Sequence, residues 1–476
     1  MTVWSSKEVI KATGGKAQGT ENWVATSVSM DSRTVGAGDL FIALNGEHFD
    51  AHKFVADALD KGAVAAIVSS VPEGLPADAP LVVVEDTLDA MIDLGEFSRG
   101  RTGAKIIAVT GSVGKSSTKE MLAAAFDVQG QTHAALGSYN NYLGVPYTLA
   151  SMHAGTDYGV FEIGMNHPGE ITPLTVLVQP EIAIITNIAG VHTEHFPGGT
   201  DDIAEAKAEI FSGVKKGGAA ILNLNDAYFN VLAGYAQDAG IEQIYSFAID
   251  NEDADAYAIN VIEGGNGVRA DVVILGERKE LFLPHGGRHT LMNALPVLLS
   301  VKLCHCNLDK SIKALSTNEP LAGRGKREYL DYGDPENPVT LIDDSFNASP
   351  TSMQAGFKVL ALIDPGRGGR RIAILGDMLE LGADEKQQHA DLALPLRAAN
   401  IDLVYTCGSL MKNLHDALPP EQKAVHKESS TELAQIVPDA LIPGDVVMVK
   451  GSKSSKMGVV VEAMRKVEKC KNQQEK

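Results

Sequence analysis

The sequence predicts an α/β protein made of three consecutive parts, each built around a largely parallel sheet. Apolar runs of strand length alternate with stretches of helical spacing almost throughout the 476 residues. This alternation is typical of parallel sheets covered by helices. The chain is also too long for one ordinary domain. We expect the parts at residues 1–85, 86–318 and 319–476, with the last part Rossmann-like.

The expected elements follow this division. The first part ends in a polar loop at residues 69–80 and an apolar strand at 81–86. The central part opens with a strand and helix at 105–126, and three apolar strands follow it, at residues 158–165, 181–189 and 217–226. Residues 257–284, which contain a GGNG turn, predict antiparallel strands, and residues 289–303 have helical spacing. Four apolar strands separated by helical stretches define the third part, at residues 339–345, 370–378, 403–408 and 446–452.

Composition excludes several classes of protein. The formal net charge is −20, whereas binding to a nucleic-acid backbone needs a basic surface. The 4 cysteines are too few for a disulfide framework and fit a reducing compartment. Cys304 and Cys306 flank a histidine, but without a second Cys/His pair nearby we interpret them as helix-end residues. The sequence has neither a secretory signal nor an apolar run of about 18 residues, so we expect a cytoplasmic protein without a transmembrane segment.

Residues 105–119 read KIIAVTGSVGKSSTK, an apolar strand that runs through a glycine-rich turn into a helix. The main-chain N–H groups of such a turn bind phosphate oxygens. The residues expected to contact ATP here are Thr110, Gly111, Ser112, Val113, Gly114, Lys115 and Ser116. Lys115 would bridge the β- and γ-phosphates, and the Ser116 hydroxyl would ligate Mg²⁺. The general P-loop has glycine where Val109 stands, so a structural turn with a surface lysine is the alternative.

Glu162 ends the apolar strand at residues 158–165. Open α/β sheets bind ligands beyond the carboxyl ends of their strands, and Mg²⁺ takes oxygen ligands. We therefore predict that Glu162 holds the metal ion. A solvated carboxylate at the rim of the sheet is the alternative interpretation.

The shortened loop TGSVGKS resembles the phosphate loop of the Mur ligases and of the folylpolyglutamate synthases. Other segments resemble the Mur ligases alone, and they are AKAEIF, LIDDSFNASP, ILGDMLELG and VVMVKGSKSSKM. Residues 31–68 resemble the UDP-binding first domain of that family, so the resemblance covers nearly the whole chain. The DNPR segment of ligases that add diaminopimelate is absent. The chain is thus identified as a member of the Mur ligase family, closest to the branch that adds D-alanyl-D-alanine.

The resemblance implies several further site residues. His192, after the strand that ends near Asn187, would be a catalytic residue and a ligand of a second Mg²⁺, whereas His195 has no such support. Lys207 matches a family lysine that can react with CO₂, and its carbamate would hold Mg²⁺. That chemistry needs an unprotonated amine and so a lowered pKa. A surface lysine paired with Glu205 or Glu209 remains the alternative.

The resemblance also implies contacts with the nucleotide and with the muramyl substrate. The expected nucleotide contacts beyond the phosphate loop are Asn293, Arg324, Asp344 and Asn347, and Asp343 is the alternative to Asp344. The expected substrate contacts are Ser32 and Arg33 near the UDP end, and Asn140 and Asn141 near the muramyl peptide.

The implied activity is an ATP- and Mg²⁺-dependent ligation through an acyl phosphate. It would join D-alanyl-D-alanine to UDP-MurNAc-tripeptide for peptidoglycan synthesis, with the enzyme acting as a monomer. A ligase similar to the folylpolyglutamate synthases is one alternative, and the UDP-type first part argues against it. A non-catalytic, nucleotide-gated binding protein is another. The set formed by Lys115, Ser116, Glu162, His192 and Lys207 argues against that second alternative.

Overall fold

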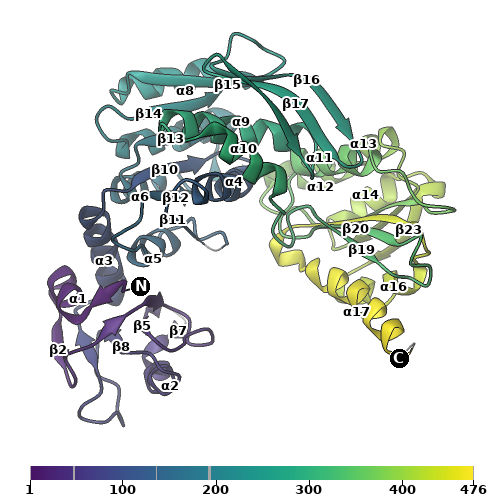
Figure 1. The fold of residues 1–476 in the computed structure, drawn as a ribbon. Helices are drawn as coiled ribbons and strands as arrows, with labels where there is room; N and C mark the ends of the chain where they lie inside the picture. The colour runs from purple at the N-terminus through teal and green to yellow at the C-terminus, as the bar shows by residue number, and fades with distance from the viewer. Residues whose placement is uncertain (1, 47–48, 136, 191–194, 475–476) are drawn as a thin grey trace.

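The computed structural model describes residues 2–46, 49–135, 137–190 and 195–474. It has three α/β parts that follow one another along the chain as lobes of an arc, the first at one end and the last at the other (Figure 1). His192, predicted as a metal ligand, lies outside the described residues. Within the described ranges, no helix is both long and apolar enough to cross a membrane.

The first part is a small sheet in the order β2-β9-β8-β5-β4, parallel except for the β2–β9 pair. Its strands are β1 (Trp4–Ser5), β2 (Lys16–Gln18), β3 (Val24–Ala25), β4 (Ser27–Ser29), β5 (Asp39–Ile42), β6 (Asn45–Gly46), β7 (Phe49–Asp50), β8 (Ala65–Val68) and β9 (Leu81–Val83). Its helices are α1 (Ser6–Thr13) and α2 (Val55–Asp60), and α3 (Thr87–Arg101), which begins the range expected for the central part, packs on its core. Helix α3 packs Met91 and Leu94 into the same core as Trp4 and Leu40.

The central sheet has the order β11-β12-β10-β13-β14-β15-β16-β17-β18. Its strands are β10 (Lys105–Thr110), β11 (Thr132–Ala134), β12 (Tyr158–Glu162), β13 (Ile182–Ile185), β14 (Ala219–Asn223), β15 (Gln243–Ile249), β16 (Ala256–Gly264), β17 (Gly267–Ile274) and β18 (Glu277–Leu283). Its helices are α4 (Lys115–Asp127), α5 (Gly144–Ala150), α6 (Ile171–Val178), α7 (Thr200–Ala208), α8 (Phe229–Asp238), α9 (Arg288–Leu303) and α10 (Leu308–Thr317). The strands pair in parallel as far as β16, and the predicted antiparallel strands are confirmed as β16, β17 and β18.

The third sheet has the order β19-β20-β24-β21-β22-β23, parallel apart from the antiparallel β19–β20 pair. Its strands are β19 (Lys326–Leu330), β20 (Val339–Asp344), β21 (Arg371–Gly376), β22 (Leu403–Cys407), β23 (Lys423–Lys427) and β24 (Val446–Lys450). Its helices are α11 (Pro350–Ala361), α12 (Glu385–Ala390), α13 (Ala393–Ala398), α14 (Met411–Ala417), α15 (Ser430–Ala434), α16 (Val437–Ala440) and α17 (Gly458–Gln474). Apolar cores cover both faces of this sheet, which agrees with its near-continuous apolar strands.

Candidate active site

A cleft of about 720 Å³ lies between the central and the third sheet. On the side of the central sheet, the cleft is lined by the turn after β10, the end of β12 and the start of α9. The facing wall is made by the turns after β20, β21 and β24. The carboxyl ends of strands from both sheets therefore converge on one cavity, which is where open α/β sheets bind ligands.

Two glycines shape the turn between β10 and α4. Gly111 and Gly114 have φ values of 143° and 91°, in the region that favours glycine. A Cβ atom on Gly111 would lie 1.9 Å from Thr186 Oγ1, and one on Gly114 would lie 2.6 Å from Asn293 Oδ1. Side chains of neighbouring elements thus approach the main chain of the turn closely, and Asn293 lies directly against Gly114.

Asn187, which follows the end of β13, binds the phosphate loop through its side chain. Its Oδ1 accepts a hydrogen bond from the Val113 N–H at 3.0 Å, and its Nδ2 donates to the Val113 carbonyl at 3.2 Å. The Thr186 hydroxyl donates to the same carbonyl at 2.6 Å. The side chains of Asn187 and Thr186 therefore support the conformation of the loop.

Lys115 is the first residue of α4, and its ammonium group lies against the main chain of the phosphate loop. Nζ donates to the carbonyl oxygens of Gly111 at 2.6 Å and Ser112 at 3.2 Å. Burial lowers the pKa of Lys115; repulsion by Arg324 acts in the same direction, and the Glu162 carboxylate opposes both. The Lys115 ammonium group therefore lies near both the Glu162 carboxylate and a second cation, Arg324.

Glu162 and Ser116 have the chemistry of a magnesium site. The Glu162 side chain is buried, and its Oε1 accepts from Asn140 Nδ2 at 2.7 Å. Its Oε2 is buried without a hydrogen-bond partner among the residues that the structure describes. A buried carboxylate oxygen without a donor is unfavourable unless a cation or a water molecule satisfies it. A hard cation such as Mg²⁺ fits the chemistry of this oxygen, and the Ser116 hydroxyl, which also lines the cleft, would offer a second oxygen ligand.

Lys207 lies on α7 and is only 2% exposed. Neither a hydrogen bond nor an ion pair joins its amine to any described residue, so the alternative interpretation, a surface lysine paired with Glu205 or Glu209, does not hold. Burial, together with repulsion by Lys115, lowers the pKa of Lys207 well below its ordinary value. An amine in this setting is a candidate for reaction with CO₂. His195, for which no role was predicted, packs against the ring of His167.

The segment just before β19 contributes a cation that reaches across the cleft. Arg324 Nη2 donates to Ser138 Oγ of the central part at 2.7 Å, and its guanidinium lies 4.1 Å from the centre of the Phe346 ring. Asp344, at the end of β20, and Asn347 both line the cleft. Asp343 is instead buried and bonded to Ser345 and Arg465. The geometry therefore favours Asp344 over Asp343 as the residue that can meet a ligand.

The predicted substrate contacts are divided between two regions. Asn140 lines the cleft, and Asn141 accepts from the Gly144 N–H at 3.0 Å at the start of α5. Ser32 and Arg33 lie in the first part, in the loop after β4, and they do not line this cleft. Arg33 is largely exposed and pairs with Asp31 at 2.7 Å.

The buried Lys450 at the end of β24 is among the cleft residues that the sequence analysis did not identify. The sequence feature that could have identified Lys450 is its position directly after the apolar residues of a strand, in the segment VVMVKGS. Cys304 and Cys306 follow the end of α9, which confirms them as helix-end residues. Within the described ranges, no group of three or more His, Cys, Asp or Glu side chains forms a metal cluster.

Comparisons with known proteins agree with this architecture. Three family models match, namely the Mur ligase family catalytic domain at residues 24–99, the Mur ligase middle domain at 109–301 and the Mur ligase glutamate ligase domain at 331–453. The chain is 34% identical to the UDP-N-acetylmuramoyl-tripeptide--D-alanyl-D-alanine ligase of Rickettsia prowazekii, over 97% of this chain and 99% of that protein. It is also 34% identical to the Escherichia coli (strain K12) protein of the same name, over 93% and 94% of the two chains.

Solved structures give the same result. MurF from Acinetobacter baumannii superposes with a TM-score of 0.82 at 29% identity, covering 97% of this chain and 99% of that one. The MurF ligase from Thermotoga maritima in complex with ADP has the same fold, with a TM-score of 0.76 at 24% identity over 94% and 98% of the chains.

Proposed function

The chain belongs to the Mur ligase family, and we propose that it joins D-alanyl-D-alanine to UDP-MurNAc-tripeptide with conversion of ATP to ADP and phosphate. The product is a precursor of peptidoglycan. One observation carries this proposal at the site: the phosphate loop and Glu162 face Arg324, Asp344 and Asn347 across a single cleft. A nucleotide on the loop would therefore meet residues of both sheets.

The reaction has two steps. A carboxylate oxygen of the tripeptide attacks the γ-phosphorus of ATP, the bond between the γ-phosphorus and the bridging oxygen breaks, and ADP leaves. The amine of D-alanyl-D-alanine then attacks the acyl carbon, loses a proton and displaces phosphate. Lys115 and Arg324 stabilise negative charge on the transferring group. Closed walls keep water from the acyl phosphate, which it would otherwise hydrolyse.

We propose Mg²⁺ as the metal cofactor, held by Glu162 and Ser116 and, through a carbamate, by Lys207. The Glu162 Oε2, which has no hydrogen-bond partner among the described residues, and the burial of Lys207 support this assignment. The ion would supply positive charge against the phosphates. Residues 1–85 would bind the UDP end of the substrate through Ser32 and Arg33, and we expect the enzyme to act as a cytoplasmic monomer.

Phosphate release tests the proposal directly. Release is expected only when ATP, Mg²⁺, UDP-MurNAc-tripeptide and D-alanyl-D-alanine are all present, and it should stop when any one of them is omitted. Rapid release with glutamate and a folate, but none with the muramyl peptide, would move the assignment to the folylpolyglutamate synthases. Nucleotide binding without turnover under any of these conditions would instead indicate the non-catalytic alternative.

A further inference from the structure

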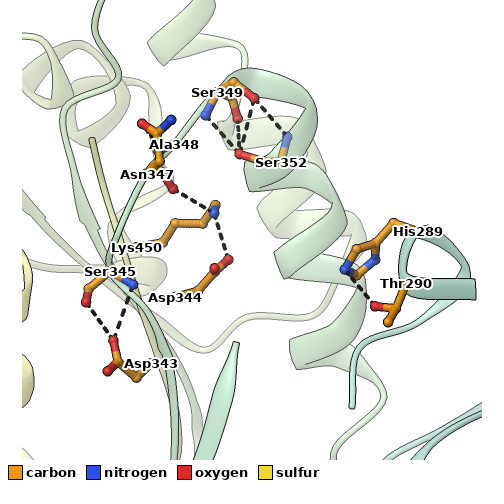
Figure 2. A network of polar contacts seen from close by, with 10 residues as sticks. All are labelled: His289, Thr290, Asp343, Asp344, Ser345, Asn347, Ala348, Ser349, Ser352 and Lys450. Carbon is orange, nitrogen blue, oxygen red and sulfur yellow. Dashed lines mark hydrogen bonds and ion pairs between the residues drawn. The ribbon is translucent and has the colours of Figure 1, made fainter. Parts of the chain in front are cut away.

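Lys450 lies at the centre of a polar network on the third-sheet wall of the cleft (Figure 2). Its Nζ donates to Asp344 Oδ2 at 2.7 Å and to the main-chain carbonyl of Asn347 at 2.9 Å. Strands β20 and β24 are parallel neighbours, with Asp344 directly opposite Lys450. One ammonium group therefore joins the end of β20 to the turn that follows it.

Burial makes this contact important for the local structure. The Lys450 side chain is 4% exposed, whereas that of Asp344 is 26% exposed. A buried ammonium needs acceptors, and the carboxylate and the carbonyl supply two for its three donors. Burial raises the pKa of Asp344, and the charge of Lys450 opposes that rise. Lys450 thus helps to keep Asp344 ionised as well as to hold it in place.

The turn is also fixed at its other end. Ser349 caps α11: its hydroxyl accepts from the Ser352 N–H, while the Ser352 hydroxyl accepts from the Ser349 N–H at 2.8 Å. Asn347 lies between this cap and Lys450 (Figure 2). With both ends held, the conformation of the short segment that presents Asn347 to the cleft depends directly on Lys450.

We propose that Lys450 is a positioning residue of the ligase, which holds Asp344 and the turn at Asn347 in the geometry that receives the adenine nucleotide. The inference rests on the function proposed above. Asp344 and the Asn347 carbonyl take two of the three donors of its ammonium, so we infer that Lys450 acts through these residues, and the double-mutant cycle below tests direct contact with the phosphates. Its loss should therefore weaken nucleotide binding and leave the other two substrates unaffected.

The first test compares Lys450→Met and Lys450→Arg with Lys412→Met. Lys412 serves as the control because it is a half-exposed lysine of the same part, paired with Asp416 one turn along α14. Lys450→Met should raise the KM for ATP and the Kd of a non-hydrolysable ATP analogue about tenfold or more. The KM values for the muramyl peptide and D-alanyl-D-alanine should stay within about twofold. Lys450→Arg should recover most of the affinity, and the control should match the wild type.

Because removal of a buried charge can destabilise a protein, Lys450→Gln serves as a second variant. Its amide keeps one donor for the Asn347 carbonyl but carries no charge, and the same selective rise in the KM for ATP is expected. Wild-type affinity for the analogue in either folded, uncharged variant would overturn the proposal. Analogue binding is measured without turnover, so failure of the ligase assay alone would count against the proposed function and not against the role of Lys450.

A double-mutant cycle separates positioning from direct contact with nucleotide. If Lys450 acts through Asp344, Lys450→Met should add little to the loss of affinity already caused by Asp344→Asn. If Lys450 binds the phosphates itself, the two losses should multiply, and that result would overturn the assignment.

Discussion

At the scale of single residues, opposed charges surround the phosphate loop. Glu162 attracts both Lys115 and Arg324, while the two cations repel each other. An incoming triphosphate would bring negative charge between these cations and relieve their repulsion. The same groups would then meet the charge that develops on the transferring phosphoryl group, where electrostatic interactions in a water-excluded site are strong.

Lys115→Ala should therefore abolish most of the turnover without unfolding the protein. A loss of about 3–4 kcal/mol of transition-state stabilisation corresponds to a fall in kcat of roughly 10²–10³-fold. Steady-state phosphate release and a thermal melt are the measurements. Near-normal kcat in a folded Lys115→Ala protein would show that the loop is only a structural turn.

Lys207 gives a second prediction at this scale. As a carbamate it would present negative oxygens, so both Lys207→Ala and Lys207→Arg should be nearly inactive, although arginine keeps the positive charge. Removal of CO₂ from the wild type should lower activity reversibly, and formate or acetate should partly restore Lys207→Ala. A fully active Lys207→Arg enzyme would rule out the carbamate and leave Glu162 and Ser116 as the metal ligands.

How far the site could be predicted differs from residue to residue. The phosphate loop and Glu162 were named from a motif and a strand end, and Arg324 and Asp344 from the family resemblance; the structure brings them to one cleft, and their roles remain predictions. The choice between Asp343 and Asp344 needed the structure, because only tertiary partners reveal that Asp343 faces Arg465. Lys450 was missed for the same reason: a lysine after an apolar strand is buried only if a neighbouring strand supplies its counter-charge.

At the scale of elements, apolar strands were predictable and polar ones were not. β21, β22 and β24 were expected from near-continuous apolar runs, which buried parallel strands require. β19, with the sequence KREYL, was not predicted; it lies at the edge of its sheet, and only Leu330 is buried. Such a strand is specified by pairing with β20 rather than by its own pattern.

The strand–turn–helix unit at β10 and α4 predicts the effect of Gly114→Ala. The residue has a left-handed φ of 91°, which costs an L-residue about 1–2 kcal/mol. The new methyl group would also press on Asn293, so unfolding in denaturant should occur at lower concentration and the ATP analogue should bind more weakly.

Two further variants separate these causes. Asn293→Ala in the Gly114→Ala background should recover the part of the stability lost to the steric clash, but not the part lost to the backbone conformation. Gly100→Ala, at an exposed helical site with nothing near its Cβ, should be neutral or slightly stabilising. Unaltered stability and affinity in Gly114→Ala would contradict the close approach of Asn293.

At the scale of the whole molecule, the reaction requires the walls of the cleft to come together around three ligands. The phosphate loop lies in the central part and the Asp344–Lys450 network in the third part, and the UDP end is expected in the first part. The hydrogen bond from Arg324 to Ser138 already joins the two walls of the cleft. A ligand that bridges both walls would add interactions only in a closed arrangement, and such differential binding is what shifts a conformational equilibrium.

Small-angle scattering should therefore show compaction when a non-hydrolysable ATP analogue and UDP-MurNAc-tripeptide are added together, and less compaction with either one alone. Arg324→Gln removes a charged contact between the walls, so this variant should need more nucleotide to reach the same compact profile. Lys412→Met, on the outer surface of the third part, should behave as the wild type. An unchanged profile with both ligands, or full compaction with the muramyl peptide alone, would contradict closure driven by the nucleotide. Closure that needs both ligands would also explain how the acyl phosphate is protected, because the site would exclude water only once both reactants are in place.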